Sequence, residues 1–173
     1  MKPRIVVIGL GNTLMGDEGL GVCALRELRE APARGPVDYY DGGTRGLLLL
    51  PFMEEASHLL LLDAVQSNDP PGTALEITGQ ELLSAKIPLK FSAHDIALPD
   101  LLTLFLLRRG DPGPKLHFVG ITPASMEMST DLSPPVRKAM PELLARAKRV
   151  LAGWIAEIEN PVPGGAHVLG SAR

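Results

Sequence analysis

Apolar residues occur along this chain in runs and in helical stripes that alternate with one another. Aliphatic runs at residues 5–10, 58–65 and 116–121 are typical of strands buried on both faces of a parallel sheet. Shorter runs at 37–40 and 74–78 predict two more strands. The chain therefore has enough strand signals for one five-stranded sheet.

Helices are predicted between these strands by apolar residues at helical spacing. They cover residues 17–30, 46–55, 79–85, 94–108 and a long segment from 133 to about 158. Asp17 is expected to cap the first of them. This alternation predicts a three-layer α/β/α fold with a mostly parallel five-stranded sheet. We expect one domain over residues 1–159 and a flexible tail, rich in glycine and proline, over 160–173.

Composition and charge limit the expected cellular compartment and binding partners. The formal net charge of −3 argues against a nucleic-acid partner, because phosphate binding needs a basic surface. The leucine runs at 47–50 and 59–62 are far shorter than the ~20 residues that span a bilayer, so membrane insertion is not expected. The N-terminus lacks a signal-peptide pattern and Cys23 is the single cysteine, which together predict a cytoplasmic protein.

The turn after the first strand, residues 9–21, carries five glycines. Such a turn is typical of a phosphate site, but Asp17 and Glu18 end it, and carboxylates favour a cation over a phosphate. Leu14 stands where a dinucleotide-binding turn needs a small residue, and the P-loop pattern Gly-Lys-Ser/Thr is absent. A nucleotide- or small-ligand-binding module that uses this turn is retained as the alternative function.

Polar side chains follow several of the predicted strands and suggest a metal site. Glu18 follows the first strand, Asp63 ends the third, and His94 begins a helix after a loop, so all three can reach the carboxyl edge of the sheet. Two carboxylates and an imidazole suit a first-row divalent ion and leave coordination positions open. Each residue alone also has a structural explanation, such as an acid in a first helical turn. A zinc hydrolase that binds its own metal is a further alternative.

Other hydrolytic chemistry has no local support in the sequence. The patterns His-Glu-x-x-His and Gly-x-Ser-x-Gly do not occur. Cys23 lies among apolar residues of the first predicted helix, which indicates a structural cysteine and not a nucleophile. Asp41 follows the second strand and is predicted at the same edge as the metal site.

Taken in order, these segments resemble the hydrogenase maturation endopeptidases, which process the large subunit of nickel–iron hydrogenases. Residues 9–21 match the family's opening Gly-x-Gly-Asn-x-Leu-x-x-Asp-Glu-x-x-Gly, and residues 41–44 match its Asp-Gly-Gly-Thr. Further matches lie at residues 58–64, 92–94, 119–123 and 132–134. The resemblance covers residues 5 to about 151.

The resemblance implies a monomeric endopeptidase, either aspartyl-type or metal-dependent. It implies that the enzyme removes a C-terminal extension from the large-subunit precursor after nickel has been loaded. Glu18, Asp63 and His94 map onto the family's metal ligands, and the acid at Asp41 is implicated in activity. The nickel belongs to the precursor, so the isolated enzyme is expected to hold none or another divalent ion. We hypothesise that Asp41 or one of the ligand carboxylates is the base that activates water.

Overall fold

The computed structural model describes residues 2–83, 90–91, 98–109 and 113–161. The strands of its sheet are β1 (Ile5–Leu10), β2 (Val37–Gly43), β3 (His58–Gln66), β4 (Ala74–Thr78) and β6 (Lys115–Ile121). They lie in the order β2-β1-β3-β6-β4. All neighbours are parallel except β4, which is antiparallel to β6. The two-residue β5 (Lys90–Phe91) pairs with the end of β3. The predicted mostly parallel five-stranded sheet is confirmed.

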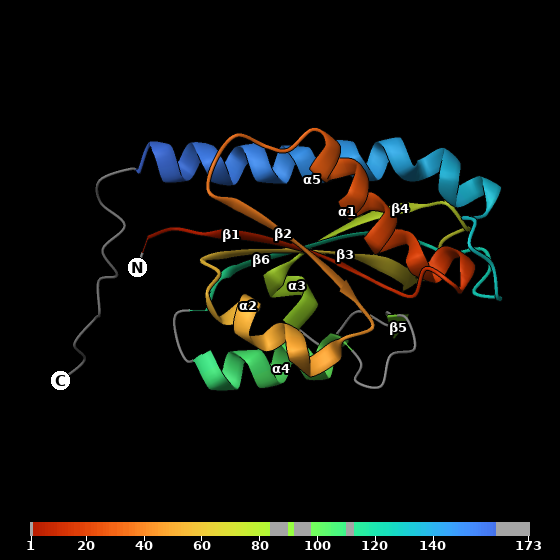
Figure 1. Ribbon diagram of the computed structural model, residues 1–173, viewed down its shortest axis with the longest axis horizontal. Coiled ribbons are helices and arrows are strands. Elements are labelled where there is room, and N and C mark those ends of the chain that lie inside the picture. Colours follow the sequence, from red (N-terminus) through yellow and green to blue (C-terminus); the bar gives the residue numbers. More distant parts are fainter. Residues whose placement is uncertain (1, 84–89, 92–97, 110–112, 162–173) are drawn as a thin grey trace.

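Helices cover both faces of this sheet and make the three layers (Figure 1). On one face lie α1 (Leu20–Glu30) and α5 (Pro134–Glu159). On the other lie α2 (Leu50–Glu54), α3 (Gly79–Leu83) and α4 (Leu98–Arg109). Short 3-10 turns, η1 (Gly16–Gly19) and η2 (Gly46–Leu49), lead into α1 and α2. Within the described ranges, no helix is both long and apolar enough to cross a membrane.

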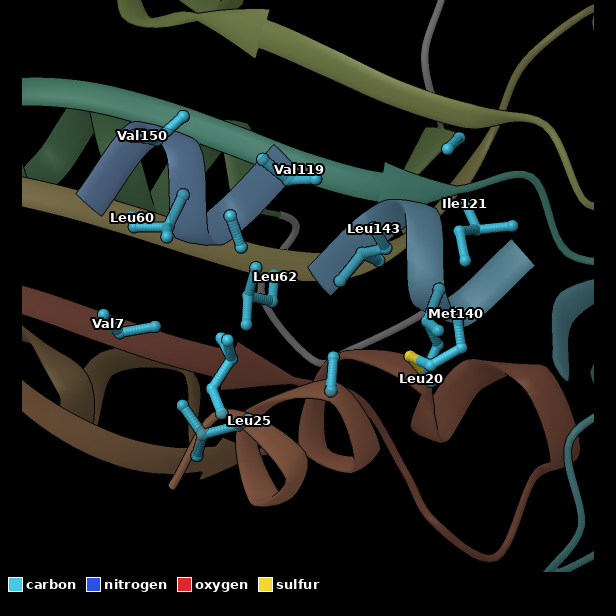
Figure 2. Close-up of a cluster of buried hydrophobic side chains, with 14 of the residues drawn as sticks. Val7, Leu20, Leu25, Leu60, Leu62, Val119, Ile121, Met140, Leu143 and Val150 are labelled. Carbon is cyan, nitrogen blue, oxygen red and sulfur yellow. The ribbon is translucent and has the colours of Figure 1, made fainter. Parts of the chain in front are cut away.

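The core consists of two apolar clusters separated by the sheet. Val7, Leu60 and Val119 face α1 and α5, where Leu25 and Leu143 pack against them (Figure 2). The alternate residues of the same strands face α2 and α4 on the other side. Fully burying each such side chain stabilises the fold by about 1.5–3 kcal/mol. Burial on both faces explains why these strands read as continuous apolar runs.

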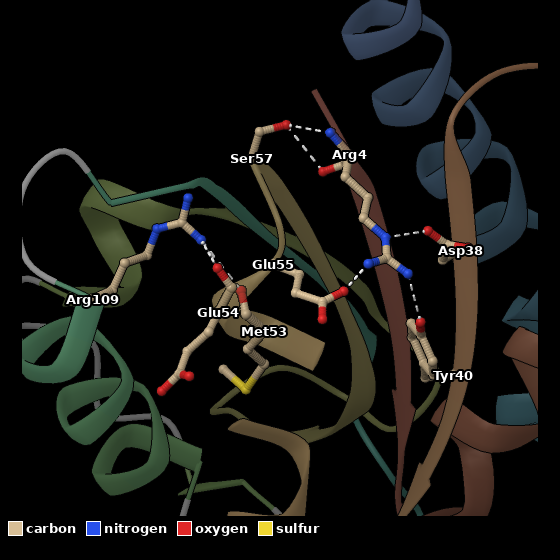
Figure 3. Close-up of polar contacts among 8 residues, drawn as sticks. All are labelled: Arg4, Asp38, Tyr40, Met53, Glu54, Glu55, Ser57 and Arg109. Carbon is tan, nitrogen blue, oxygen red and sulfur yellow. Dashed lines mark hydrogen bonds and ion pairs between the residues drawn. The ribbon is translucent and has the colours of Figure 1, made fainter. Parts of the chain in front are cut away.

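The edge of the sheet where β1 begins is fastened by polar contacts (Figure 3). The Arg4 guanidinium donates to Asp38 at 2.6 Å and to the Tyr40 hydroxyl at 3.1 Å, and it also pairs with Glu55. The Arg4 backbone N–H donates to the Ser57 hydroxyl at 2.8 Å. These contacts join β1 to β2 and to the start of β3, at the edge opposite the predicted site.

Element ends depart from the prediction in places that matter for the site. The first α-helix begins at Leu20 and not at Asp17, because the 3-10 turn η1 precedes it. β2 continues to Gly43, so Asp41 lies inside a strand and not after one. The start predicted for the helix at residue 94 falls outside the described residues. The predicted tail also lies almost entirely outside them, and the domain boundaries stay a prediction.

Candidate active site at the carboxyl edge of the sheet

The glycines of the turn after β1 let the backbone pack against itself. A Cβ on Gly11, whose φ is +119°, would lie 1.8 Å from the Glu18 carbonyl oxygen. A Cβ on Gly21 would lie 2.0 Å from the carbonyl oxygen of Leu62 in β3. Only glycine permits both approaches. The backbone of the turn therefore packs closely on itself, and the start of α1 packs closely against the end of β3.

Two predicted ligands lie buried at this edge. Glu18 in η1 is 7% exposed, and Asp63 near the end of β3 is 1% exposed. Asp63 Oδ1 accepts the Ala64 N–H at 2.8 Å. Buried carboxylates are stable only where hydrogen bonds or positive charge offset the loss of hydration. The packing of Gly21 on the Leu62 carbonyl holds the start of α1, which follows Glu18, against the strand that carries Asp63.

The third predicted ligand, His94, lies outside the described residues. Among the residues that the structure does describe, no three His, Cys, Asp or Glu side chains come together as a metal cluster. Glu18 and Asp63 are the described members of the predicted set, and the set as a whole stays a prediction.

Asp41 reaches the same edge from the α1 face of the sheet. Gly9 of β1 is in register with both Asp41 and Leu62, and residues in register across parallel strands share a face. Asp63, one residue further along β3, therefore points to the opposite face. Asp41 is about half-exposed, and its Oδ2 lies 3.7 Å from the Arg26 guanidinium of α1. A small pocket of about 160 Å³ beside it is lined by Gly11, Asn12, Thr13, Val22, Arg26, Asp41, Gly43 and Thr44.

Asp17 does not cap α1 as predicted, and Gly19 occupies that position. The Asp17 carboxylate is fully buried and accepts four hydrogen bonds from the loop between β6 and α5. The Ala124 and Ser125 N–H groups donate at 2.8 and 3.0 Å, and the Ser133 N–H and hydroxyl donate at 2.7 and 2.8 Å. Ser133 is the N-cap of α5, so a residue of η1 supplies the negative charge that favours this helix start.

Comparison with known proteins decides the family. The family model described as hydrogenase maturation protease matches residues 22–150. The chain belongs to the hydrogenase maturation protease family. The resemblance and the protease activity expected from the sequence are thereby confirmed.

Individual relatives agree with this assignment. This protease is 34% identical, over 160 residues, to the hydrogenase expression/formation protein HupD of Rhodobacter capsulatus, covering 91% of this chain and 76% of the relative. It is 36% identical over 135 residues to the hydrogenase 2 maturation protease of Escherichia coli K12, covering 77% and 81%. It superposes on the hydrogenase maturating endopeptidase HybD from E. coli with a TM-score of 0.76, at 32% identity, covering 87% and 93% of the two chains.

The surroundings of Cys23 in this protease suit a structural cysteine. The Cys23 side chain on α1 is partly buried and packs against the apolar cluster between α1, α5 and the sheet. Burial raises the pKa of the Cys23 thiol, and the neighbouring Glu27 adds to this while Arg26 opposes it. A thiol with a raised pKa is protonated at neutral pH, which suits a structural cysteine.

Two features of the protease escaped the sequence reasoning. The fastening of the β6–α5 loop by Asp17 joins residues more than 100 positions apart, so no local pattern reveals it. Arg26 lies beside Asp41 because of its position around the axis of α1. The sequence did not reveal this contact, because Arg26 belongs to a charged helix face that resembles any solvent-exposed face. Both features lie at the carboxyl edge and shape the surroundings of Glu18 and Asp41.

Proposed function

We propose that this protease removes the C-terminal extension from the nickel-loaded large-subunit precursor of a nickel–iron hydrogenase. The observation that carries the proposal is the pair of buried carboxylates, Glu18 and Asp63, at the carboxyl edge of a fold shared with hydrogenase maturation proteases. The names of the relatives, such as the hydrogenase 2 maturation protease, support the substrate class. The single cysteine supports action in the reducing cytoplasm, and we propose that the enzyme acts there as a monomer.

Nickel in the precursor serves as the recognition feature in this proposal. Glu18 and Asp63, with His94, supply two carboxylates and an imidazole, a donor set that suits nickel and leaves positions for the precursor's own ligands. A divalent cation stabilises buried carboxylates strongly, because little water screens the charges there. Docking of a nickel-loaded precursor is therefore favoured over docking of the nickel-free form.

Peptide hydrolysis then needs an activated water and a polarised carbonyl group. We assign the general base to Asp41, whose half-exposed carboxylate is open to solvent at the same edge. The Arg26 guanidinium lies 3.7 Å from this carboxylate, within ion-pair distance. Replacement of Asp41 by asparagine is expected to lower kcat by about 100- to 10,000-fold while the nickel-loaded precursor still binds. Full activity of Asp41→Asn would transfer the role of base to Glu18 or Asp63.

The nickel dependence can be tested with purified precursor in nickel-loaded and nickel-free form. Wild-type enzyme is expected to cut only the loaded form, and Glu18→Gln, Asp63→Asn and His94→Ala are expected to lose at least about 100-fold in rate. Glu30→Gln is the matched control, since it makes the same chemical change at an exposed position at the far end of α1. Wild-type activity in Glu18→Gln and Asp63→Asn would contradict the assignment of these ligands.

The two alternative functions make different predictions. A zinc hydrolase would retain tightly bound metal after purification and would cut unrelated peptides, which metal analysis and a generic peptide substrate would reveal. A nucleotide-binding module would be stabilised by nucleotides in a thermal-shift screen. The close approach of Gly11 to the Glu18 carbonyl favours a packing role for the glycines over a phosphate cradle.

A further inference from the structure

Two large apolar side chains stand exposed on loops beside the candidate site. Leu14, in the turn between β1 and η1, is 61% exposed, and Met128, in the loop between β6 and α5, is 87% exposed. Single exposed apolar residues are ordinary on protein surfaces, so only their position can indicate a binding role. These two lie on the segment that carries Glu18 and on the segment bonded to it.

Hydrogen bonds hold the two loops together as one surface. The Leu14 carbonyl accepts the Ser129 N–H at 3.0 Å, and the Gly16 N–H donates to the Ser129 carbonyl at 2.7 Å. These two bonds make a parallel bridge between Met15 and Ser129. The Asp17 carboxylate fastens the same loop at its two ends. Leu14 and Met128 adjoin this bridge, so the backbone segments that carry them are held side by side before a partner binds.

The two loops that carry this pair are acidic in sequence, and the Arg137 guanidinium of α5 donates to the Leu132 carbonyl near the end of the second loop at 2.9 Å. Residues 11–18 and 122–133 contain four acidic residues and no lysine or arginine. Two of the acids, Glu127 and Asp131, are exposed in the same loop as Met128. An acidic rim around an apolar centre favours a partner segment that is apolar and flanked by basic residues.

We propose that Leu14 and Met128 form a docking surface for the hydrogenase large-subunit precursor, and that they contact an apolar segment of it flanked by lysine or arginine. This inference rests on the proposed function and deepens it. Leu14 lies four residues before Glu18 on the segment that enters η1, so a precursor seated on the docking surface lies close to the carboxyl edge. Binding energy from Leu14 and Met128 lowers KM and leaves the chemical step unchanged.

The test is steady-state cleavage of nickel-loaded precursor by Leu14→Ser/Met128→Ser. We expect KM to rise by about tenfold or more and kcat to stay within about twofold. Leu107→Ser is the matched control, because Leu107 is 77% exposed near the end of α4, where Arg109 donates to the Glu54 carbonyl of α2. The control should keep the wild-type KM. Circular dichroism checks that the double variant is folded.

The charged rim is tested separately with Glu127→Gln/Asp131→Asn, and Asp100→Asn on α4 is its control. The rim variant should raise KM at low salt and flatten the rise of KM with ionic strength, whereas the control should behave as wild type. An unchanged salt dependence in the rim variant would overturn the basic character of the partner segment.

The outcomes separate the two proposals. If wild-type enzyme fails to cut the precursor, the proposed function falls and the docking surface falls with it. If wild type cuts and Leu14→Ser/Met128→Ser keeps the wild-type KM, the docking surface alone is overturned. Sedimentation adds a check: a wild-type dimer that the double variant abolishes would assign the surface to self-association and would also overturn the docking proposal.

Discussion

Replacing Asp17 by asparagine tests how the carboxyl edge is built. The carboxylate is fully buried and takes hydrogen bonds from Ala124, Ser125 and Ser133, so it fastens both ends of the β6–α5 loop to η1. An asparagine side chain would present one oxygen and one amide NH₂ in the same space. With its oxygen at the Oδ2 position it would keep three bonds, but its NH₂ would face the Ser133 N–H, donor against donor.

The expected cost follows from what is lost. A hydrogen bond to a charged group contributes about 1.5–3 kcal/mol. Removing the negative charge from the start of α5 costs roughly a further 0.3–1 kcal/mol. We therefore expect Asp17→Asn to lower the free energy of unfolding by about 2–4 kcal/mol, out of the roughly 5–15 kcal/mol typical of a domain. With an m value of about 2 kcal/mol per M, the urea midpoint should fall by about 1–2 M.

The assay is urea unfolding followed by the fluorescence of Trp154. This is the single tryptophan of the chain, and it is 7% exposed on α5, the helix whose start Asp17 holds. Asp131→Asn makes the same change at an exposed position in the same loop, and it should cost no more than about 0.5 kcal/mol. Equal midpoints for Asp17→Asn and Asp131→Asn would refute the reasoning.

Three other predictions address single residues. Burial raises the pKa of Cys23, so its thiol should react with Ellman's reagent at least about tenfold more slowly in the native than in the urea-unfolded state, and equal rates would contradict this. Burial lowers the pKa of His58, so the unfolded state binds more protons and stability should fall as pH drops below about 6.5. Urea midpoints at pH 7.5 and 5.5 should show a larger drop for wild type than for His58→Gln, and equal drops would reject the argument. Gly21→Ala places a Cβ 2.0 Å from a β3 carbonyl oxygen and should lower the free energy of unfolding in urea by about 1–3 kcal/mol. Gly153→Ala, in open space on α5, should not destabilise the protein. Similar urea midpoints for the two variants would contradict this prediction.

The fold was predictable because its strongest signals are local. The run at residues 5–10 is apolar at every position since β1 is buried on both faces, and this pattern distinguishes a central parallel strand from an edge strand. The start of α1 was not predictable. Asp17 resembles an N-cap in the sequence, but Ser125 and Ser133 compete for its carboxylate through contacts that only the folded chain provides.

The site was predictable as far as topology determines it. Parallel strands place Glu18 and Asp63 at one edge, and both are buried there. The faces from which Asp41 and Asp63 act depend on strand register, and a shift of one residue reverses the face. Apolar runs give no register, because every position in them is buried. The sequence therefore predicted the edge of the sheet at which Asp41 lies. It did not predict that Asp41 and Asp63 lie on opposite faces of the sheet.

The most direct test of the central proposal is the intact mass of the large-subunit precursor after incubation with the purified protease. Nickel-loaded and nickel-free precursor are treated side by side under the same conditions. The proposal predicts that the loaded precursor loses one C-terminal fragment and that the nickel-free precursor keeps its full mass. Equal shortening of both forms would contradict recognition through nickel, and full mass in both would contradict the proposed activity.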